Sequence, residues 1–222
     1  MQSIRQIVLG LGLLAAANLA QAALITLDGD HFSVTYDDAQ VGLYNQGQLS
    51  GSLDTVYFLP TTFVAVSGGA PATTQAVLQF TLNIDPGYSF AGLGFAENGN
   101  YFLSGGGLVR AAANLQAVNP DTLANATLAL SSDDALTRIG ASTSWALAGL
   151  LGPAGLDSPQ TLQITLDNAL TSEPSQGVGL IRKTYVGFRI ETRPNAVPEP
   201  SALALMLGGV LAAVLAGRRR RL

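Results

Sequence analysis

In the stretch Ala76-Val77-Leu78-Gln79-Phe80-Thr81-Leu82-Asn83-Ile84, apolar and polar side chains alternate from Leu78 to Ile84. In an extended chain, successive side chains point to opposite faces, so one face here would carry Leu78, Phe80, Leu82 and Ile84. The pattern predicts a strand with one face on a core and the other toward water. Asp85-Pro86-Gly87-Tyr88 follows and has Pro and Gly at the central positions that a type II turn favours.

Similar runs lie on both sides of this stretch, each bounded by turn residues. We expect strands at residues 31–36, 55–59, 62–66, 89–96, 101–104, 108–118, 126–130, 161–166 and 183–191. In the last of these, one predicted face consists of Thr184, Val186, Phe188 and Ile190.

The turn residues between these runs divide the body further. Asn98-Gly99 predicts a tight hairpin, and Gly105-Gly106-Gly107 predicts another turn. Residues 135–155, with the single tryptophan Trp145, fit a helical turn or a long loop. Nine or ten short strands without an internal repeat favour an all-β fold over residues 23–194, an antiparallel β-sandwich for which a jelly roll is one suitable topology.

The composition of residues 23–196 excludes several classes of function. These residues contain fourteen acidic and six basic side chains, a net charge of −8. Such a surface repels nucleic-acid phosphates, so we expect no nucleic-acid partner. The chain has no cysteine and therefore forms neither disulfides nor a thiolate site.

The residues that could carry catalysis are few. His31 is the only histidine, and the strand pattern places it on an exposed face; no Gly-x-Ser-x-Gly or His-Glu-x-x-His motif accompanies it. The acidic pairs Asp28/Asp30, Asp37/Asp38 and Asp133/Asp134 are the stronger candidates, since a glycosidase uses two carboxylates. They stand at predicted strand ends, where aspartate favours turns.

Other ligand sites are equally weak in the sequence. Acidic clusters of this kind also suit a calcium ion, but none has EF-hand spacing, so no catalytic, cofactor or metal residue is assigned. Tyr57, Tyr101 and Trp145 are candidates for stacking on sugar rings, with core packing as the alternative role.

Residues 1–22 have the three parts of a secretory signal peptide. Arg5 supplies the positive start, residues 7–17 the apolar region, and Ala20-Gln21-Ala22 the small-x-small site for signal peptidase. The body is therefore expected outside the cytoplasm.

The C-terminal tail, residues 195–222, has the composition of a membrane anchor. Val197-Pro198-Glu199-Pro200 precedes an uncharged segment, residues 201–217, and then the basic cluster Arg218, Arg219, Arg220 and Arg221. A helix rises about 1.5 Å per residue, so residues 201–217 would span roughly 25 Å, near the lower limit for one transmembrane helix. We expect the arginines to act as a stop-transfer signal and to stay in the cytoplasm.

This tail closely resembles the PEP-CTERM sorting signal of Gram-negative bacteria, in its Val197–Pro200 motif, its apolar span and its arginine end. The resemblance implies processing by an exosortase near the motif, transient anchoring in the inner membrane, and transfer to the cell surface or extracellular matrix. In that family, such processing accompanies exopolysaccharide and biofilm production.

The sequence thus favours a non-enzymatic, exported surface or matrix protein, with exopolysaccharide as a partner. A secreted carbohydrate-active hydrolase with a carboxylate pair is the alternative from another class. A periplasmic protein that keeps its anchor is a third.

Overall fold

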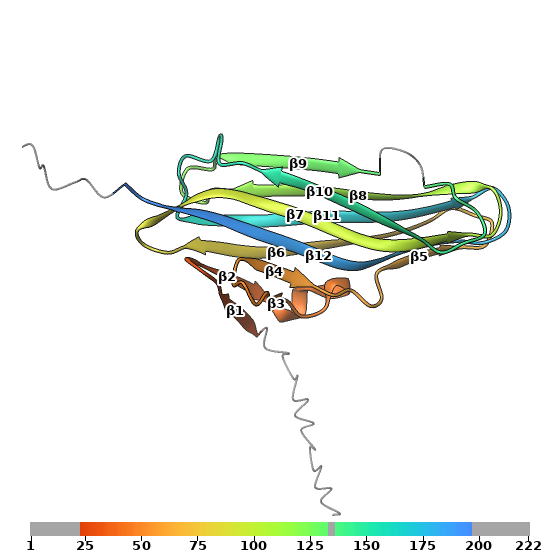
Figure 1. Ribbon diagram of the computed structural model, residues 1–222, viewed down its shortest axis with the longest axis horizontal. Helices are drawn as coiled ribbons and strands as arrows, with labels where there is room; N and C mark the ends of the chain where they lie inside the picture. The colour runs from red at the N-terminus through yellow and green to blue at the C-terminus, as the bar shows by residue number, and fades with distance from the viewer. Residues whose placement is uncertain (1–22, 133–135, 197–222) are drawn as a thin grey trace, which may run out of the picture.

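The computed structural model describes residues 23–132 and 136–196, which form two antiparallel sheets packed face to face (Figure 1). The spatial order in sheet A is β1 (Leu24–Asp28), β2 (Phe32–Asp37), β6 (Ala72–Ile84), β11 (Thr161–Pro174), β8 (Gly107–Val118) and β9 (Asn125–Ser131). The order in sheet B is β10 (Thr143–Leu151), β7 (Tyr88–Leu103), β12 (Gly179–Pro194), β4 (Thr55–Phe58) and β3 (Gln48–Leu49), and β5 (Val64–Ser67) also pairs with β12. The predicted all-β sandwich is confirmed. Two short 3-10 turns, η1 (Asp38–Gln40) and η2 (Gly42–Tyr44), follow β2.

The long strands alternate between the sheets along the chain. β6 lies in sheet A, β7 in sheet B and β8 in sheet A again, and β10, β11 and β12 lie in B, A and B. The turns between these strands therefore bridge the two layers. The predicted turn after β6 is one of them: the Tyr88 amide donates to the Asp85 carbonyl at 3.1 Å, and Gly87 has φ +90°. The triple glycine is another, joining β7 to β8.

The core lies between the two inner faces and is rich in aromatic side chains. The opening stretch behaves as expected, since Leu78, Phe80, Leu82 and Ile84 are all buried. They meet residues of sheet B such as Phe58, Phe95 and Phe188. Burial of this continuous apolar interior is what holds a domain without disulfides together.

The predicted hairpin at Asn98-Gly99 is wrong. β7 runs through this dipeptide without a break and pairs there with both β10 and β12. Glycine is needed for a different reason: a Cβ on Gly99 would lie 1.9 Å from the carbonyl oxygen of Arg182 and 2.9 Å from Nε1 of Trp145. Gly99 thus lets β12 and the Trp145 side chain of β10 come close to the backbone of β7.

Three strands and one histidine also differ from expectation. Residues 24–28 form the edge strand β1 and residues 48–49 form β3, neither of which was predicted, and residues 143–151 form β10 where a helical turn or loop was expected. His31 is not in a strand; it lies in the turn between β1 and β2 with φ 69°. Several strands are long, with 16 residues each in β7 and β12, rather than uniformly short.

The predicted inner face of β12 is wrong at one position. The register with β7 slips between Lys183 and Tyr185, which is a β-bulge. As a result Lys183 is buried, at 1% exposure, and Thr184 is exposed, whereas Val186, Phe188 and Ile190 face inward as expected. An extra residue in one strand changes the phase of the alternation beyond it.

Both predicted terminal segments lie outside the described residues. These are the signal peptide with Ala20 and Ala22, and residues 197–222 of the tail, which include the predicted transmembrane helix at residues 201–217. Among the residues that the structure describes, no helix has the length and apolar character to cross a membrane.

Candidate functional site

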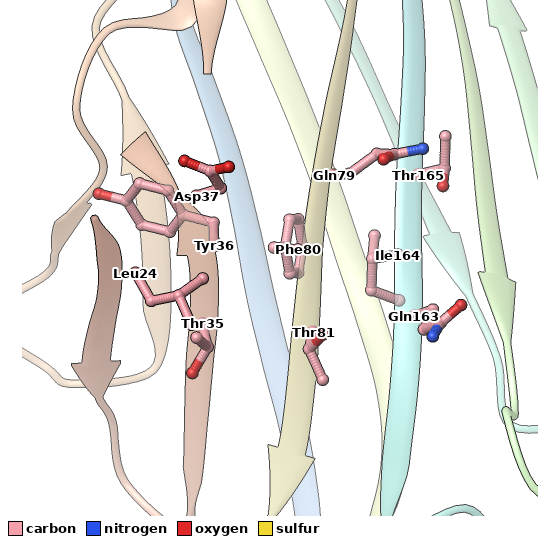
Figure 2. A pocket seen from close by; sticks show the side chains of 10 residues that line it. All are labelled: Leu24, Thr35, Tyr36, Asp37, Gln79, Phe80, Thr81, Gln163, Ile164 and Thr165. Carbon is pink, nitrogen blue, oxygen red and sulfur yellow. The ribbon is translucent and has the colours of Figure 1, made fainter. Parts of the chain in front are cut away.

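A shallow groove of about 400 Å³ crosses the outer face of sheet A (Figure 2). It spans the neighbouring strands β2, β6 and β11, and Leu24 of β1 lies at its edge. Figure 2 shows the side chains that line it: Leu24, Thr35, Tyr36, Asp37, Gln79, Phe80, Thr81, Gln163, Ile164 and Thr165.

The strand register explains why this groove is polar. Thr81 pairs with Thr35 on one side and Gln163 on the other, which places three uncharged polar side chains in one row across the sheet. Gln79 and Thr165 form the next row. Because the apolar residues of these strands point inward, the alternating threonine and glutamine residues point outward. Their hydroxyl and amide groups can both donate and accept hydrogen bonds.

Asp37 is the single charged residue that lines this groove. Its carboxylate accepts from the Ala39 amide at 2.9 Å and from Nε2 of Gln40 at 2.8 Å. Asp37 therefore caps η1, which is the turn role expected of the acidic pairs.

The other predicted acidic residues do not join Asp37 in a shared groove. Asp30 lies in a separate depression with Asp54, Arg189 and Glu191. Asp28 ends β1, and Asp38 lies exposed at the start of η1. Asp133 and Asp134 lie outside the described residues. The residues that the structure describes hold no group of three His, Asp or Glu side chains suited to a metal ion.

His31 is held in place by its neighbours rather than projecting freely. Its ring stacks on Tyr88 at 3.6 Å between centroids, with an interplanar angle of 12°. Its Nε2 lies 3.2 Å from Oδ1 of Asp30, a contact between partly exposed side chains. These contacts stabilise the turn between β1 and β2 against the start of β7.

The three aromatic residues predicted as candidates for sugar stacking differ in their exposure to solvent. Tyr101 and Trp145 are core residues, exposed by 3% and 5%. Tyr57 is half-buried on the outer face of sheet B, where its ring stacks on Tyr185 at 6.1 Å between centroids. The Tyr185 ring lies over Gly187, since a Cβ there would be 2.2 Å from the tyrosine hydroxyl. Tyr57 and Tyr185 thus form a partly exposed aromatic pair on the outer face of sheet B.

One polar cluster was not predicted at all. Lys183 of β12 and Glu97 of β7 are buried side by side in the core, and Nζ of Lys183 donates to Oε2 of Glu97. Burial raises the pKa of Glu97 and lowers the pKa of Lys183 to about 8. Only the strand bulge places Lys183 inside, so sequence periodicity carries no signal for this pair.

Comparison with known families confirms the sorting signal. Residues 196–221 match the PEP-CTERM protein-sorting motif. The match includes Val197, Pro198, Glu199 and Pro200 and the arginines at 218–221. No curated protein matches the chain.

Solved structures share only a low level of similarity with this chain. An active domain of tailspike protein 4 from bacteriophage CBA120 is 12% identical, with TM-score 0.25, over 78% of this chain and 20% of that one. The VP2 subviral particle of infectious bursal disease virus is 12% identical, with TM-score 0.27, over 85% and 58%. A carbohydrate-binding module of the β-sandwich superfamily is 10% identical, with TM-score 0.24, over 78% and 86%. The chain thus spans a fifth of the tailspike domain and less than two thirds of the VP2 chain.

Proposed function

Because residues 196–221 carry a PEP-CTERM protein-sorting motif, which implies export and exosortase processing, we propose that the chain is a non-enzymatic matrix protein that binds exopolysaccharide. Its destination would be the surface or extracellular matrix of a Gram-negative bacterium, reached through transient anchoring in the inner membrane. Signal peptidase and an exosortase would act on its two ends.

The groove on sheet A is the observation that supports the binding role. A neutral polysaccharide presents hydroxyl groups that donate and accept, and the rows Thr35–Thr81–Gln163 and Gln79–Thr165 present matching groups at strand spacing. Neighbouring strands are about 4.8 Å apart, close to the size of one sugar ring, so successive units could contact successive strands. The acidic body and its single groove carboxylate favour a neutral glycan over an acidic one.

Affinity gel electrophoresis would test this role with the extracted exopolysaccharide of the producing bacterium and with a soluble neutral glucan. Gln79→Ala and Gln163→Ala should each reduce the retardation of the protein in the gel. Gln176→Ala is the matched control, because Gln176 is exposed in the turn between β11 and β12, away from the groove.

The outcomes separate the alternatives. Retardation lost in Tyr57→Ala instead would move the binding surface to sheet B. No retardation of the wild-type protein by either polysaccharide would contradict the binding role. Release of reducing ends, abolished by Asp37→Asn or Asp38→Asn, would favour the hydrolase alternative.

A further inference from the structure

The polar side chains buried in the interior of the sandwich include Lys183, Glu97 and Asn168, none of which lines the groove. Lys183 and Glu97 are exposed by 1% and Asn168 by 0%. Lys183 donates to Oε2 of Glu97, but Oε1 of Glu97 and both amide atoms of Asn168 have no hydrogen-bond partner. Unsatisfied buried polar atoms are costly, and each requires an explanation.

The topology brings Asn168 and Lys183 together from opposite sheets. Asn168 points inward from β11 of sheet A, and Lys183 points inward from β12 of sheet B. Near the turn that joins these strands, a Cβ on Gly179 would lie 2.4 Å from Oγ of Ser172, so these two positions face each other across the layers. Asn168 is four residues before Ser172, and Lys183 is four residues after Gly179, with no register shift between them.

Glu97 lies next to both of these side chains. It contacts the Lys183 amine directly. Burial raises the pKa of the Glu97 carboxyl, and the Asn168 carboxamide is near enough to offset a small part of that rise, although the contact lacks hydrogen-bond geometry. Aromatic rings surround the group: Nζ of Lys183 is 4.9 Å from the Phe63 ring centroid and 5.9 Å from that of Trp145.

Burial shifts both groups of the pair toward their uncharged forms. Burial is the largest influence on both groups, and it raises the pKa of Glu97 while lowering that of Lys183 to about 8. Transfer of one proton from the ammonium to the carboxylate leaves a neutral amine, which is a nucleophile, beside a neutral carboxylic acid, which is a proton donor.

We propose that Lys183 and Asn168 form an intramolecular isopeptide bond, with Glu97 as the proton-transfer residue. Nζ of Lys183 attacks Cγ of Asn168, and Glu97 moves a proton from the attacking nitrogen to Nδ2. The bond from Cγ to Nδ2 then breaks and ammonia leaves, so that one amide replaces another. No oxidant or cofactor is consumed.

The bond would covalently join sheet A to sheet B. An exported domain without cysteine has no disulfide to supply such a link. The cluster also has a cost as an ordinary ion pair, because apolar residues of similar volume often stabilise a core better than buried charges. An amide at Nζ carries no charge, so formation of the bond removes the cost of a buried ammonium group.

Mass spectrometry of the full-length chain, purified in detergent and digested with trypsin, tests the proposal. A linked Lys183 is not cleaved, so residues 139–182 should appear joined to residues 183–189, with a total mass lower by one ammonia than the sum of the two peptides. Separate peptides of unmodified mass in the wild-type protein would overturn the proposal. So would ammonia loss confined to the Asn168 peptide, which would indicate a succinimide.

Variants identify the participants. Asn168→Ala and Lys183→Met should each abolish the joined peptide, and Glu97→Gln should greatly reduce its yield. Ser172→Ala is the matched control: Ser172 is also fully buried on the inner face of β11, with an unpartnered Oγ, and its loss should leave the joined peptide unchanged. A joined peptide that persists in Asn168→Ala would overturn the assignment. The mass of the wild-type peptides tests the presence of the bond even if a variant fails to fold.

Discussion

Phe80 of β6 and Phe188 of β12 meet edge to face across the two sheets, with ring centroids 4.9 Å apart and an interplanar angle of 72°. Phe188 also contacts the rings of Phe58 and Phe95. One residue of sheet B therefore joins aromatic side chains from three other strands. This contact lies under the groove, since Phe80 is also among the residues beneath it.

Phe188→Ala should destabilise the domain strongly. Truncation of a buried phenylalanine costs about 3–5 kcal/mol in unfolding free energy, because it removes contacts and leaves a cavity. Chemical denaturation monitored by Trp145 fluorescence would measure the loss. Phe102→Ala is the control, since Phe102 is 36% exposed, and its effect should be much smaller. Equal losses would contradict the assigned core.

Gly99→Ala should also be destabilising, although alanine is normally tolerated in strands. The new Cβ would press against the Arg182 carbonyl, so β7 and β12 would have to separate; overpacking of this kind costs about 1–3 kcal/mol. The same denaturation assay applies. Gly94→Ala in the same strand is the control, because its nearest contact, Cβ of Arg189, is at an ordinary 3.4 Å. A neutral Gly99→Ala would contradict the close approach.

Asp54 predicts a modest dependence of stability on pH. Hydrogen bonds from Ser52 at 2.6 Å and Thr55 at 2.8 Å, with a smaller contribution from Arg189, lower the pKa of its carboxyl below 3.8. The folded state thus favours the carboxylate. The resulting stability is present above the pKa of the unfolded chain and is lost as pH falls through the lower folded pKa.

Asp54→Asn should therefore reduce stability at neutral pH, and the difference from wild type should shrink in acid. We expect about 1 kcal/mol or less, because the side chain is 35% exposed and screened. Thermal melts of wild type and variant at neutral pH and at acidic pH measure this difference. Glu173→Gln is the control, because Glu173 is an exposed acidic residue. A difference that grows in acid would have the wrong sign.

The sorting motif predicts how the mature protein ends. Intact mass of the protein from the native host should show loss of residues 1–22 and of everything from about Pro198 onward. Pro198→Ala with Glu199→Ala should block the second cleavage, whereas Glu191→Gln, outside the motif, should not. Mature protein that still carries Arg218–Arg221 would contradict exosortase processing.

The basic cluster predicts that the protein is retained in the inner membrane before an exosortase cleaves it. Replacement of all four arginines by alanine should weaken membrane retention, because no charge would then oppose passage of the apolar segment. Cell fractionation would measure the change. Unaltered retention would assign no stop-transfer role to the arginines.

The features that local chemistry determines were accessible from the sequence. Alternation of apolar and polar residues over 78–84 predicted a half-buried strand because side chains of an extended chain point to opposite faces. Pro86-Gly87 predicted its turn because those residues suit the required backbone angles. The sorting motif is likewise a local property, read along the chain by other proteins, and its family match agrees.

Other features depended on contacts between distant strands. Asn98-Gly99 has the composition of a turn, yet the small size of Gly99 serves a close approach of β12 and Trp145. β10 has little alternation of its own, but pairing with the edge of β7 makes it a strand. The bulge after Lys183 reverses the inner face of β12 and places the amine beside Glu97 and Asn168. Register between strands is a tertiary property. The sequence alone therefore determined the two-layered β fold and the sorting signal of this protein. Only the folded structure decided which side chains meet inside it.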